Sequence, residues 1–300
     1  MEASQELERL TRELDNFQNI AKYLVPLPGE VPRLSGIDVW GGSVQLNGSV
    51  GGDHITYIDF KQRFDLQARI ERAREEGRFD VADNLHRCQH KAGIAVMDVA
   101  GHQMTDALLA AMLHQAFLLG AIYELDRYGQ ITRRLFENLN TRFYQSSGTH
   151  KYVSMIYGEI SEDAKFRFLT AGVPFPVVFS NVHNRFMEVS DHLKVSFPPL
   201  GMMPSFVIDR RLTTSLLGFK ERYEMNEWSL MGRGDILLLH TDGLSDHRVQ
   251  DEWYLPGRLE EVLRGVKHLG SREIYEAIKR DALAFGHPAD DISIVVIKLK

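Results

Sequence analysis

The sequence predicts an α+β protein in which helices flank antiparallel β-structure, and three features of the chain support this. A segment of helical length, 107–119, is almost wholly apolar. The apolar period then changes from the helical spacing to alternation over 151–168, which is typical of strands. Strands that follow helices in this way form the antiparallel meander of an α+β domain. The 300 residues, 44% hydrophobic and 25% charged, suffice for a sizeable core.

Charge and cysteine content exclude several classes of protein. A formal net charge of -6 without a basic tail argues against a nucleic-acid binder. Cys88 is the single cysteine, which excludes an internal disulfide and cysteine-rich zinc sites and favours a reducing, cytoplasmic location. The acidic, polar N-terminal segment is unlike a signal peptide. No membrane span is expected, because the longest apolar run, 107–113, is too short.

A heptad pattern over residues 1–30 predicts a separate N-terminal helix before the main domain, 31–300. Its apolar residues recur at alternating spacings of three and four, the seam of a coiled coil, at Leu7, Leu10, Leu14, Phe17, Ala21 and Leu24. Pro26 and Pro28 end the pattern. Two interpretations stay open: the helix lies on its own domain, or it forms a homodimer seam or signalling linker.

The first part of the main domain combines a strand with a helical insertion. Residues 37–45 partly alternate and predict the first strand. Residues 61–91 are charged and predict two short helices that project between two strands. His86 and His90 stand one helical turn apart, but no carboxylate or thiol motif accompanies them. A solvated helix face is therefore favoured over a metal pair.

The central stretch, 92–119, is predicted to be a strand, a metal-binding turn and a buried helix. Its helical part, 107–119, is apolar on nearly every face and is expected to be covered by its neighbours. Asp106, in the first turn, suits the positive end of the helix dipole. Further helices are expected over 131–144, 256–266 and 271–285, and strands over 151–160, 166–168, 175–180, 185–189, 228–231, 235–242 and 292–299, while the proline-containing segment 191–221 forms no long element.

Four carboxylate positions share one context, at a strand end beside glycine or proline: Asp53, Asp98, Asp242 and the pair Asp290/Asp291. A carboxylate at the mouth of a buried strand is costly unless it is paired or coordinated. Together the four describe an all-oxygen site, which suits Mg²⁺ or Mn²⁺. Two such ions, bridged by carboxylates, activate water against a phosphoryl group, so the reaction class indicated is metal-assisted hydrolysis.

Five motifs in order resemble those of the PPM-type (protein phosphatase 2C) family. They are Gly51-Gly52-Asp53, Met97-Asp98-Val99-Ala100-Gly101-His102, Thr170-Ala171-Gly172 followed by Pro176, Gly234-Asp235 with Thr241-Asp242-Gly243, and Asp290-Asp291-Ile292-Ser293. The similarity covers about residues 35–300 and is greatest to bacterial phosphatases related to sporulation stage II protein E and to stress-response serine phosphatases. It implies two antiparallel sheets packed as a sandwich with flanking helices, and metals at one end.

The resemblance also implies roles for single residues. Asp98 would bridge two Mn²⁺ or Mg²⁺ ions, and the Val99 carbonyl would ligate one of them. Asp53 would serve the first ion, directly or through water. Asp242 and Asp290 would complete the second, with Asp291 the less suitable ligand of its pair.

Some positions depart from the family pattern. Thr56 replaces a second aspartate after Gly-Gly-Asp, and Asp59 lies out of register to substitute for it. Gln103 replaces a glycine after Gly101-His102, and the histidine of the Ala-Gly-His motif is missing. His102 is a candidate general acid or a residue that fixes the turn. The insertion 61–91 replaces a short hairpin of the family.

The expected function is a phosphoserine/phosphothreonine protein phosphatase with Asp98, Asp53 and Asp242 as catalytic residues. A metal-bridging water would attack the phosphate of a small bacterial regulatory protein of the anti-anti-sigma type, in stress-response signal transduction. The alternative is a catalytically weak, phosphatase-like scaffold whose interaction surface is the insertion 61–91. A GGDEF-type cyclase is weaker, because Glu-Phe does not follow Gly-Gly-Asp and the later aspartate motifs would go unexplained.

Overall fold

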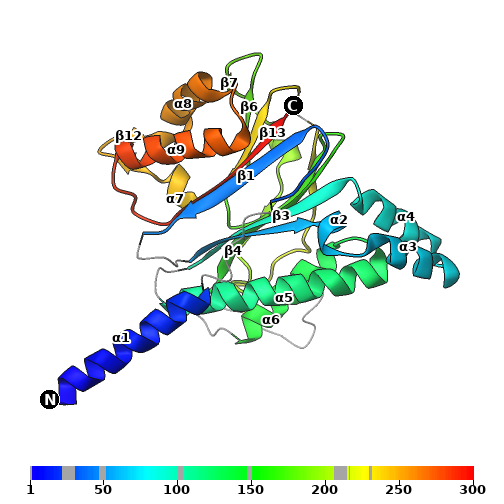
Figure 1. Cartoon of the computed structure of the whole chain (residues 1–300), viewed down its shortest axis with the longest axis horizontal. Coiled ribbons are helices and arrows are strands. Elements are labelled where there is room, and N and C mark those ends of the chain that lie inside the picture. The colour runs from blue at the N-terminus through cyan, green and yellow to red at the C-terminus, as the bar shows by residue number, and fades with distance from the viewer. Residues whose placement is uncertain are drawn as a thin grey trace.

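In the computed structural model two β-sheets lie face to face, with helices on both outer sides (Figure 1). The structure describes residues 2–21, 31–46, 52–100, 104–146, 151–205, 215, 217–229 and 232–300. The predicted α+β class and the sandwich arrangement are confirmed. The elements follow the alternation and helical periods of the sequence, and the way they stack places the candidate site at one end.

The first sheet has five antiparallel strands in the order β1 (Ile37–Val44), β13 (Ile292–Leu299), β10 (Ile236–His240), β6 (Val177–Ser180) and β7 (Arg185–Phe186). The second has six strands: β2 (Asp53–Asp59), β3 (Lys91–Val99), β4 (Val153–Ser161), β5 (Phe166–Ala171) and β8 (Ser196–Phe197) in order, with β9 (Asn226–Trp228) also paired to β5. A separate hairpin joins β11 (Arg248–Val249) to β12 (Glu252–Trp253).

One strand pair corrects the expectation of wholly antiparallel sheets. β8 runs parallel to β5. A parallel neighbour requires a crossover connection, and here the chain between the two strands passes through β6 and β7 of the opposite sheet. Alternation within each strand does not reveal such a crossover, so only the assembled fold decides it.

Most of the helices lie on the two outer sides of the sandwich. The helices are α1 (Glu2–Ala21), α2 (Phe60–Arg63), α3 (Leu66–Glu75), α4 (Phe79–Cys88), α5 (Met104–Tyr128), α6 (Arg133–Ser146), α7 (Asp242–Ser245), α8 (Leu259–Val266) and α9 (Ser271–Phe285), with a 3₁₀ turn at Asp191–Leu193 and a π-helical turn at Tyr254–Arg258. Helices α8 and α9 cover the first sheet, and α3 to α6 cover the second. A third apolar cluster fills the space between the sheets.

The expectation that helix 107–119 is covered on nearly every face is wrong. In α5 one row of side chains, Leu113, Phe117, Ala121 and Leu125, is fully buried against the second sheet. Leu108, Met112 and Leu119 are 51%, 55% and 70% exposed. A helix on the outer face of a sheet has neighbours only on its inner side, and composition does not reveal which side that is.

Among the described residues one stretch, Leu108–Tyr128, is long and apolar enough by composition to cross a membrane. This is weak evidence, because helices in the cores of soluble proteins have the same composition, and α5 packs on a sheet.

The other predicted elements differ from the observed ones mainly at their ends. The segment 61–91 contains three helices, α2 to α4, between β2 and β3, one turn more than expected. β7 covers only the start of the expected strand 185–189, and β9 ends where the strand 228–231 was expected to begin. α1 extends away from the sandwich past the first turns of α5 (Figure 1), and Leu10 on it is 50% exposed.

Candidate active site

Two of the predicted carboxylates lie opposite each other at one end of the second sheet. Asp53 begins β2 and pairs in register with Asp98 near the end of β3. Side chains alternate along a strand, and the inward neighbours Ile55 and Val96 belong to the cluster between the sheets. Asp53 and Asp98 therefore also point into the space between the sheets. Nothing in their local sequence indicates this pairing, which the antiparallel register of β2 and β3 creates.

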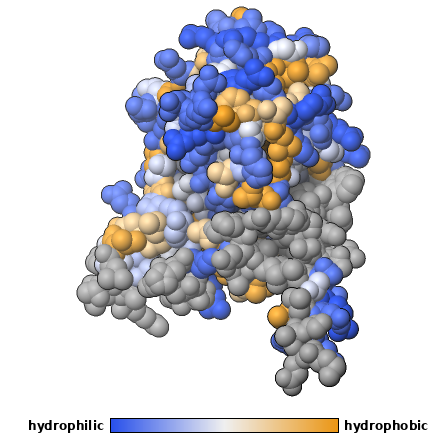
Figure 2. Space-filling view, turned by 90° about the vertical axis from the view of Figure 1, so that its left-hand side faces the viewer, coloured by the Kyte–Doolittle hydropathy of each residue, from blue (hydrophilic) through white to orange (hydrophobic). Residues whose placement is uncertain are grey.

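The other two carboxylates come from the same end of the first sheet. Asp242 follows β10, which ends there, and Asp290 precedes β13, which begins there beside it. The Thr241 N–H donates to the Ser293 carbonyl at 3.1 Å, which holds the two segments together. Figure 2 views the molecule from this end, where α7 lies, and the surface above the grey residues is hydrophilic with hydrophobic patches in between.

A hydrogen bond joins the two sheets at the site. Thr241 Oγ1 donates to Asp53 Oδ2 at 2.8 Å and accepts from the Ser293 N–H at 3.0 Å. Asp53 is buried, and this burial, followed by the charge of Asp98, raises its pKa well above the usual range of an aspartate. The hydrogen bond from Thr241 holds the Asp53 carboxylate in one orientation, and burial leaves its negative charge poorly solvated.

The site carboxylates repel one another. Burial, followed by the charges of Asp242 and Asp290, raises the pKa of Asp98 to about 7. The pKa of Asp242 is raised by burial and then by Asp290. Converging, partly desolvated carboxylates are the donor set that hard divalent cations prefer, since a cation removes both penalties.

The carboxylates are oxygen ligands of the type that Mn²⁺ and Mg²⁺ prefer, and their mutual repulsion would be relieved by a bound cation. Within the part of the chain that the structure describes, no three His, Cys, Asp or Glu side chains already form a closed group around one point. The ligand assignments of Asp53, Asp98, Val99, Asp242 and Asp290 therefore stay predictions.

Asp291 has a different role from its neighbour. It is buried, with Oδ1 accepting from the Leu46 N–H at 2.6 Å and Oδ2 from the Gly52 N–H at 3.0 Å. It thereby fixes the backbone on both sides of residues 47–51. Asp290 is exposed, with Oδ1 accepting from the Asp291 N–H. That Asp290, rather than Asp291, is the ligand of the pair stays a prediction.

Other candidates lie away from the site or outside the described residues. Asp59 ends β2 opposite to Asp53 and caps α2, accepting from the Gln62 N–H at 3.1 Å. His102 lies outside the described residues. His86 contacts Arg74, and His90 contacts Glu162. The two histidines thus have separate partners, as expected for a solvated helix face.

Two polar pairs beside the site were not foreseen. Lys151 pairs with Asp106, which the dipole argument had explained without a partner. His54, next to Asp53, contacts His114 of α5 through Nε2 and Nδ1 at 2.7 Å. Each pair joins residues at least 45 positions apart. No local signal in the sequence links them.

Comparison with known proteins relates this architecture to one family. The family model of stage II sporulation protein E (SpoIIE) matches residues 89–300. Phosphoserine phosphatase RsbP of Bacillus subtilis is 28% identical over 160 residues, which are 53% of this chain and 34% of RsbP. The match thus spans about a third of that relative.

Solved structures share the fold at low identity. The SiaA PP2C domain of Pseudomonas aeruginosa superposes with a TM-score of 0.64 at 16% identity, covering 100% of both chains. The PP2C domain of SpoIIE from Bacillus subtilis, with a fragment of its regulatory domain, gives 0.59 at 15% identity and covers 89% of this chain and 64% of that one. These similarities extend to the fold alone.

Proposed function

The chain belongs to the SpoIIE family of PP2C/PPM-type phosphatase domains, and on this premise we propose that it is a metal-dependent phosphoserine/phosphothreonine protein phosphatase. The observation that carries the proposal is the convergence of Asp53, Asp98, Asp242 and Asp290 at one end of the sandwich, where burial and mutual charge raise the pKa of Asp98 to about 7. Such a centre favours a cation over protons at neutral pH.

In the proposed mechanism Asp98 would hold both cations, Asp53 would serve the first, and Asp242 and Asp290 would serve the second, with the Val99 carbonyl as a further ligand. When bound, Mn²⁺ or Mg²⁺ supplies Lewis-acid activation of water and neutralises phosphoryl charge. Thr241 keeps the Asp53 carboxylate oriented by its 2.8 Å hydrogen bond. Asp53 and Asp98 lie in paired strands, and Asp242 and Asp290 lie next to strand ends, so the fold would hold the carboxylates in place and limit reorganisation during the reaction.

Hydrolysis of a phosphoserine peptide with added Mn²⁺ tests the proposal. Asp98→Ala and Asp242→Ala should each lower kcat/KM at least 100-fold. Asp163→Ala is the matched control, because Asp163 is an exposed carboxylate beside Ser161, where β4 ends far from the site. Wild-type activity no higher than that of the two site variants contradicts a phosphatase.

We also propose that the substrate is a small bacterial regulatory protein of the anti-anti-sigma type, acting in the cytoplasm. The support is membership of the SpoIIE family and the similarity to RsbP, a phosphoserine phosphatase. Release of phosphate from a phosphorylated protein of this type should be at least tenfold faster than from an unrelated phosphoprotein. Equal rates would contradict the substrate class.

The N-terminal segment, 1–30, is proposed to be a homodimer seam attached to the phosphatase domain, 31–300. Its heptad seam supports this, as does the exposure of Leu10 on α1. A dimer formed there would shift the equilibrium between two positions of the Gly-Gly-Asp turn and thereby change the occupancy of the metal site. Removing residues 1–28 should halve the mass measured by light scattering, and an unchanged monomeric mass before and after truncation counts against the seam.

The alternative is a catalytically weak scaffold that binds a regulatory partner through the insertion 61–91. The observation in its favour is that α3 and α4 lie at the end of the sandwich away from α7 (Figure 1), with Phe79 66% exposed. Metal-stimulated hydrolysis that is lost in Asp98→Ala would exclude this alternative.

A further inference from the structure

Lys151 lies just before β4, where this strand runs beside the end of β3 that carries Asp98. Its Nζ donates to Asp106 Oδ1 at 2.5 Å and to the Ala100 carbonyl at 3.0 Å. Asp106 is fully buried in the first turn of α5, whereas the Lys151 side chain is 32% exposed. One lysine therefore connects three segments: the residues after Asp98, the start of α5 and the start of β4.

The two peptide units that follow Val99 are both held from the start of β4. The Ala100 N–H donates to the Tyr152 carbonyl at 3.1 Å. In a trans peptide the C=O points opposite to the N–H of the next residue, so the Val99 carbonyl points away from β4. Lys151 then holds the following carbonyl, that of Ala100. Without this contact the second peptide unit would lose its anchor.

Asp106 explains why the lysine stays in place. An ammonium group bound only to a carbonyl would rotate out into the solvent, whereas a fully buried carboxylate requires a counter-charge beside it. Asp106 also lies close enough to Asp98 that its charge contributes to the raised pKa of Asp98. The pair is thus adjacent to the site carboxylates and does not use any of them.

We propose that Lys151, anchored by Asp106, is a positioning residue that orients the Val99–Ala100 backbone toward a bound divalent cation and thereby sets the affinity for it. This inference rests on the proposed function, since it assumes a cation beside Asp98. Residues that orient the ligands of a metal typically change its affinity 10- to 100-fold when they are replaced.

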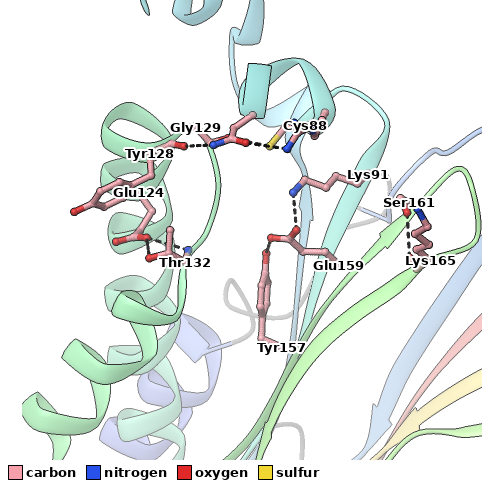
Figure 3. Close-up of polar contacts among 12 residues, drawn as sticks. Cys88, Lys91, Glu124, Tyr128, Gly129, Thr132, Tyr157, Glu159, Ser161 and Lys165 are labelled. Carbon is pink, nitrogen blue, oxygen red and sulfur yellow. Dashed lines mark hydrogen bonds and ion pairs between the residues drawn. The ribbon is translucent and has the colours of Figure 1, made fainter. Parts of the chain in front are cut away.

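A second ion pair offers a matched control. Lys91 Nζ contacts Glu159 Oε2 at 2.6 Å, with the two side chains 13% and 3% exposed, and the Tyr157 hydroxyl donates to the same carboxylate (Figure 3). Lys91 begins β3, at the end opposite to Asp98. Lys91→Met removes a pair of the same chemistry from the same sheet without touching the site.

Direct Mn²⁺ binding by isothermal titration calorimetry tests the role of Lys151. Lys151→Met should raise the Kd for Mn²⁺ about tenfold, with kcat at saturating Mn²⁺ changed less than threefold. Lys151→Arg should keep the Kd within about threefold of the wild-type value, because a guanidinium retains the positive charge and has several N–H donors to offer to the two oxygens. Lys91→Met should lower Tm and leave the Kd unchanged.

The sign of the effect separates positioning from simple electrostatics. Removing a positive charge beside a cation site should tighten Mn²⁺ binding if charge alone matters. Equal or tighter binding by Lys151→Met therefore overturns the inference. If this variant does not fold, Lys151→Met combined with Asp106→Asn takes its place. The pair then loses one charge of each sign, so charge alone predicts a nearly unchanged Kd, whereas the lost contact to the Ala100 carbonyl predicts weaker binding, and equal or tighter binding again overturns the inference.

The two proposals fail in different ways. A wild-type protein that binds Mn²⁺ but hydrolyses no phosphopeptide contradicts the proposed function, while the comparison of Kd values still decides the role of Lys151. A wild-type protein that binds no Mn²⁺ overturns both.

Discussion

Replacing Asp98 with asparagine should stabilise the protein when divalent metals have been removed. Burial and the charges of Asp242 and Asp290 raise the pKa of Asp98 to about 7, against 3.8 for an ordinary aspartate. The unfolded chain releases this proton near pH 4, whereas the folded chain retains it to near pH 7. The unfolded state is therefore increasingly favoured as pH rises between these values. Asparagine has nearly the same shape and no charge to desolvate.

The magnitude follows from linkage. At about 1.36 kcal/mol per pH unit, the raised pKa of Asp98 lowers the free energy of unfolding by about 4 kcal/mol at pH 7.5 and by about 1.6 kcal/mol at pH 5. Partial exposure to solvent reduces the gain expected for Asp98→Asn to about 2–4 kcal/mol at pH 7.5. The same substitution should abolish phosphopeptide hydrolysis, because the proposed bridging ligand is lost.

The assay is urea unfolding in EDTA at pH 5 and pH 7.5, followed by circular dichroism. Asp163→Asn is the control, because the Ser161 hydroxyl lowers the pKa of that exposed carboxyl and its removal should bring no gain. Saturating Mn²⁺ should stabilise the wild type and leave Asp98→Asn unchanged. A metal-free Asp98→Asn protein that is no more stable than wild type at pH 7.5 would refute the argument that the uncompensated negative charge of Asp98 destabilises the folded protein.

Three further predictions concern other parts of the fold. Glu137→Gln should lower the free energy of unfolding by about 3–5 kcal/mol, because Lys220 loses its counter-charge. The two side chains lie 2.8 Å apart, with Lys220 1% and Glu137 5% exposed. Adding Lys220→Met should recover at least half of the loss measured by urea unfolding, and additive losses would contradict this. Burial raises the pKa of Cys88 to about 12, so iodoacetamide at pH 8 should label it only in urea, and labelling of native protein at the same rate would argue against its burial. Gly243→Ala should lower the free energy of unfolding by about 1–3 kcal/mol and abolish activity, because the new Cβ would lie 2.0 Å from the Asp291 carbonyl oxygen. An unchanged Tm and kcat would contradict this prediction.

Much of the site could be predicted because its signals are local. Asp98 and Asp242 each lie at the end of an apolar run with a glycine at most three residues later, and this pattern is visible within ten residues of sequence. The motifs and their order then indicated the family to which the chain belongs. The strands β1, β3 and β13 followed from alternation and apolar runs in the same way.

What the sequence did not indicate depends on contacts between distant segments. The apolar composition of α5 predicted a helix but not its exposed row at Leu108, Met112 and Leu119, since the neighbours that leave that row uncovered come from elsewhere in the chain.

The same division holds at the site. The sequence by itself determined the type of most of the long elements, the family and the aspartates at the strand ends, because short-range periodicity and motif spacing encode them. Only the tertiary structure decided that Asp53 faces Asp98, that Asp291 fixes the backbone on both sides of residues 47–51, and that Lys151 neutralises Asp106. Strand register and buried charge pairing join residues far apart in the chain, and their energies are defined only once the sheets have stacked.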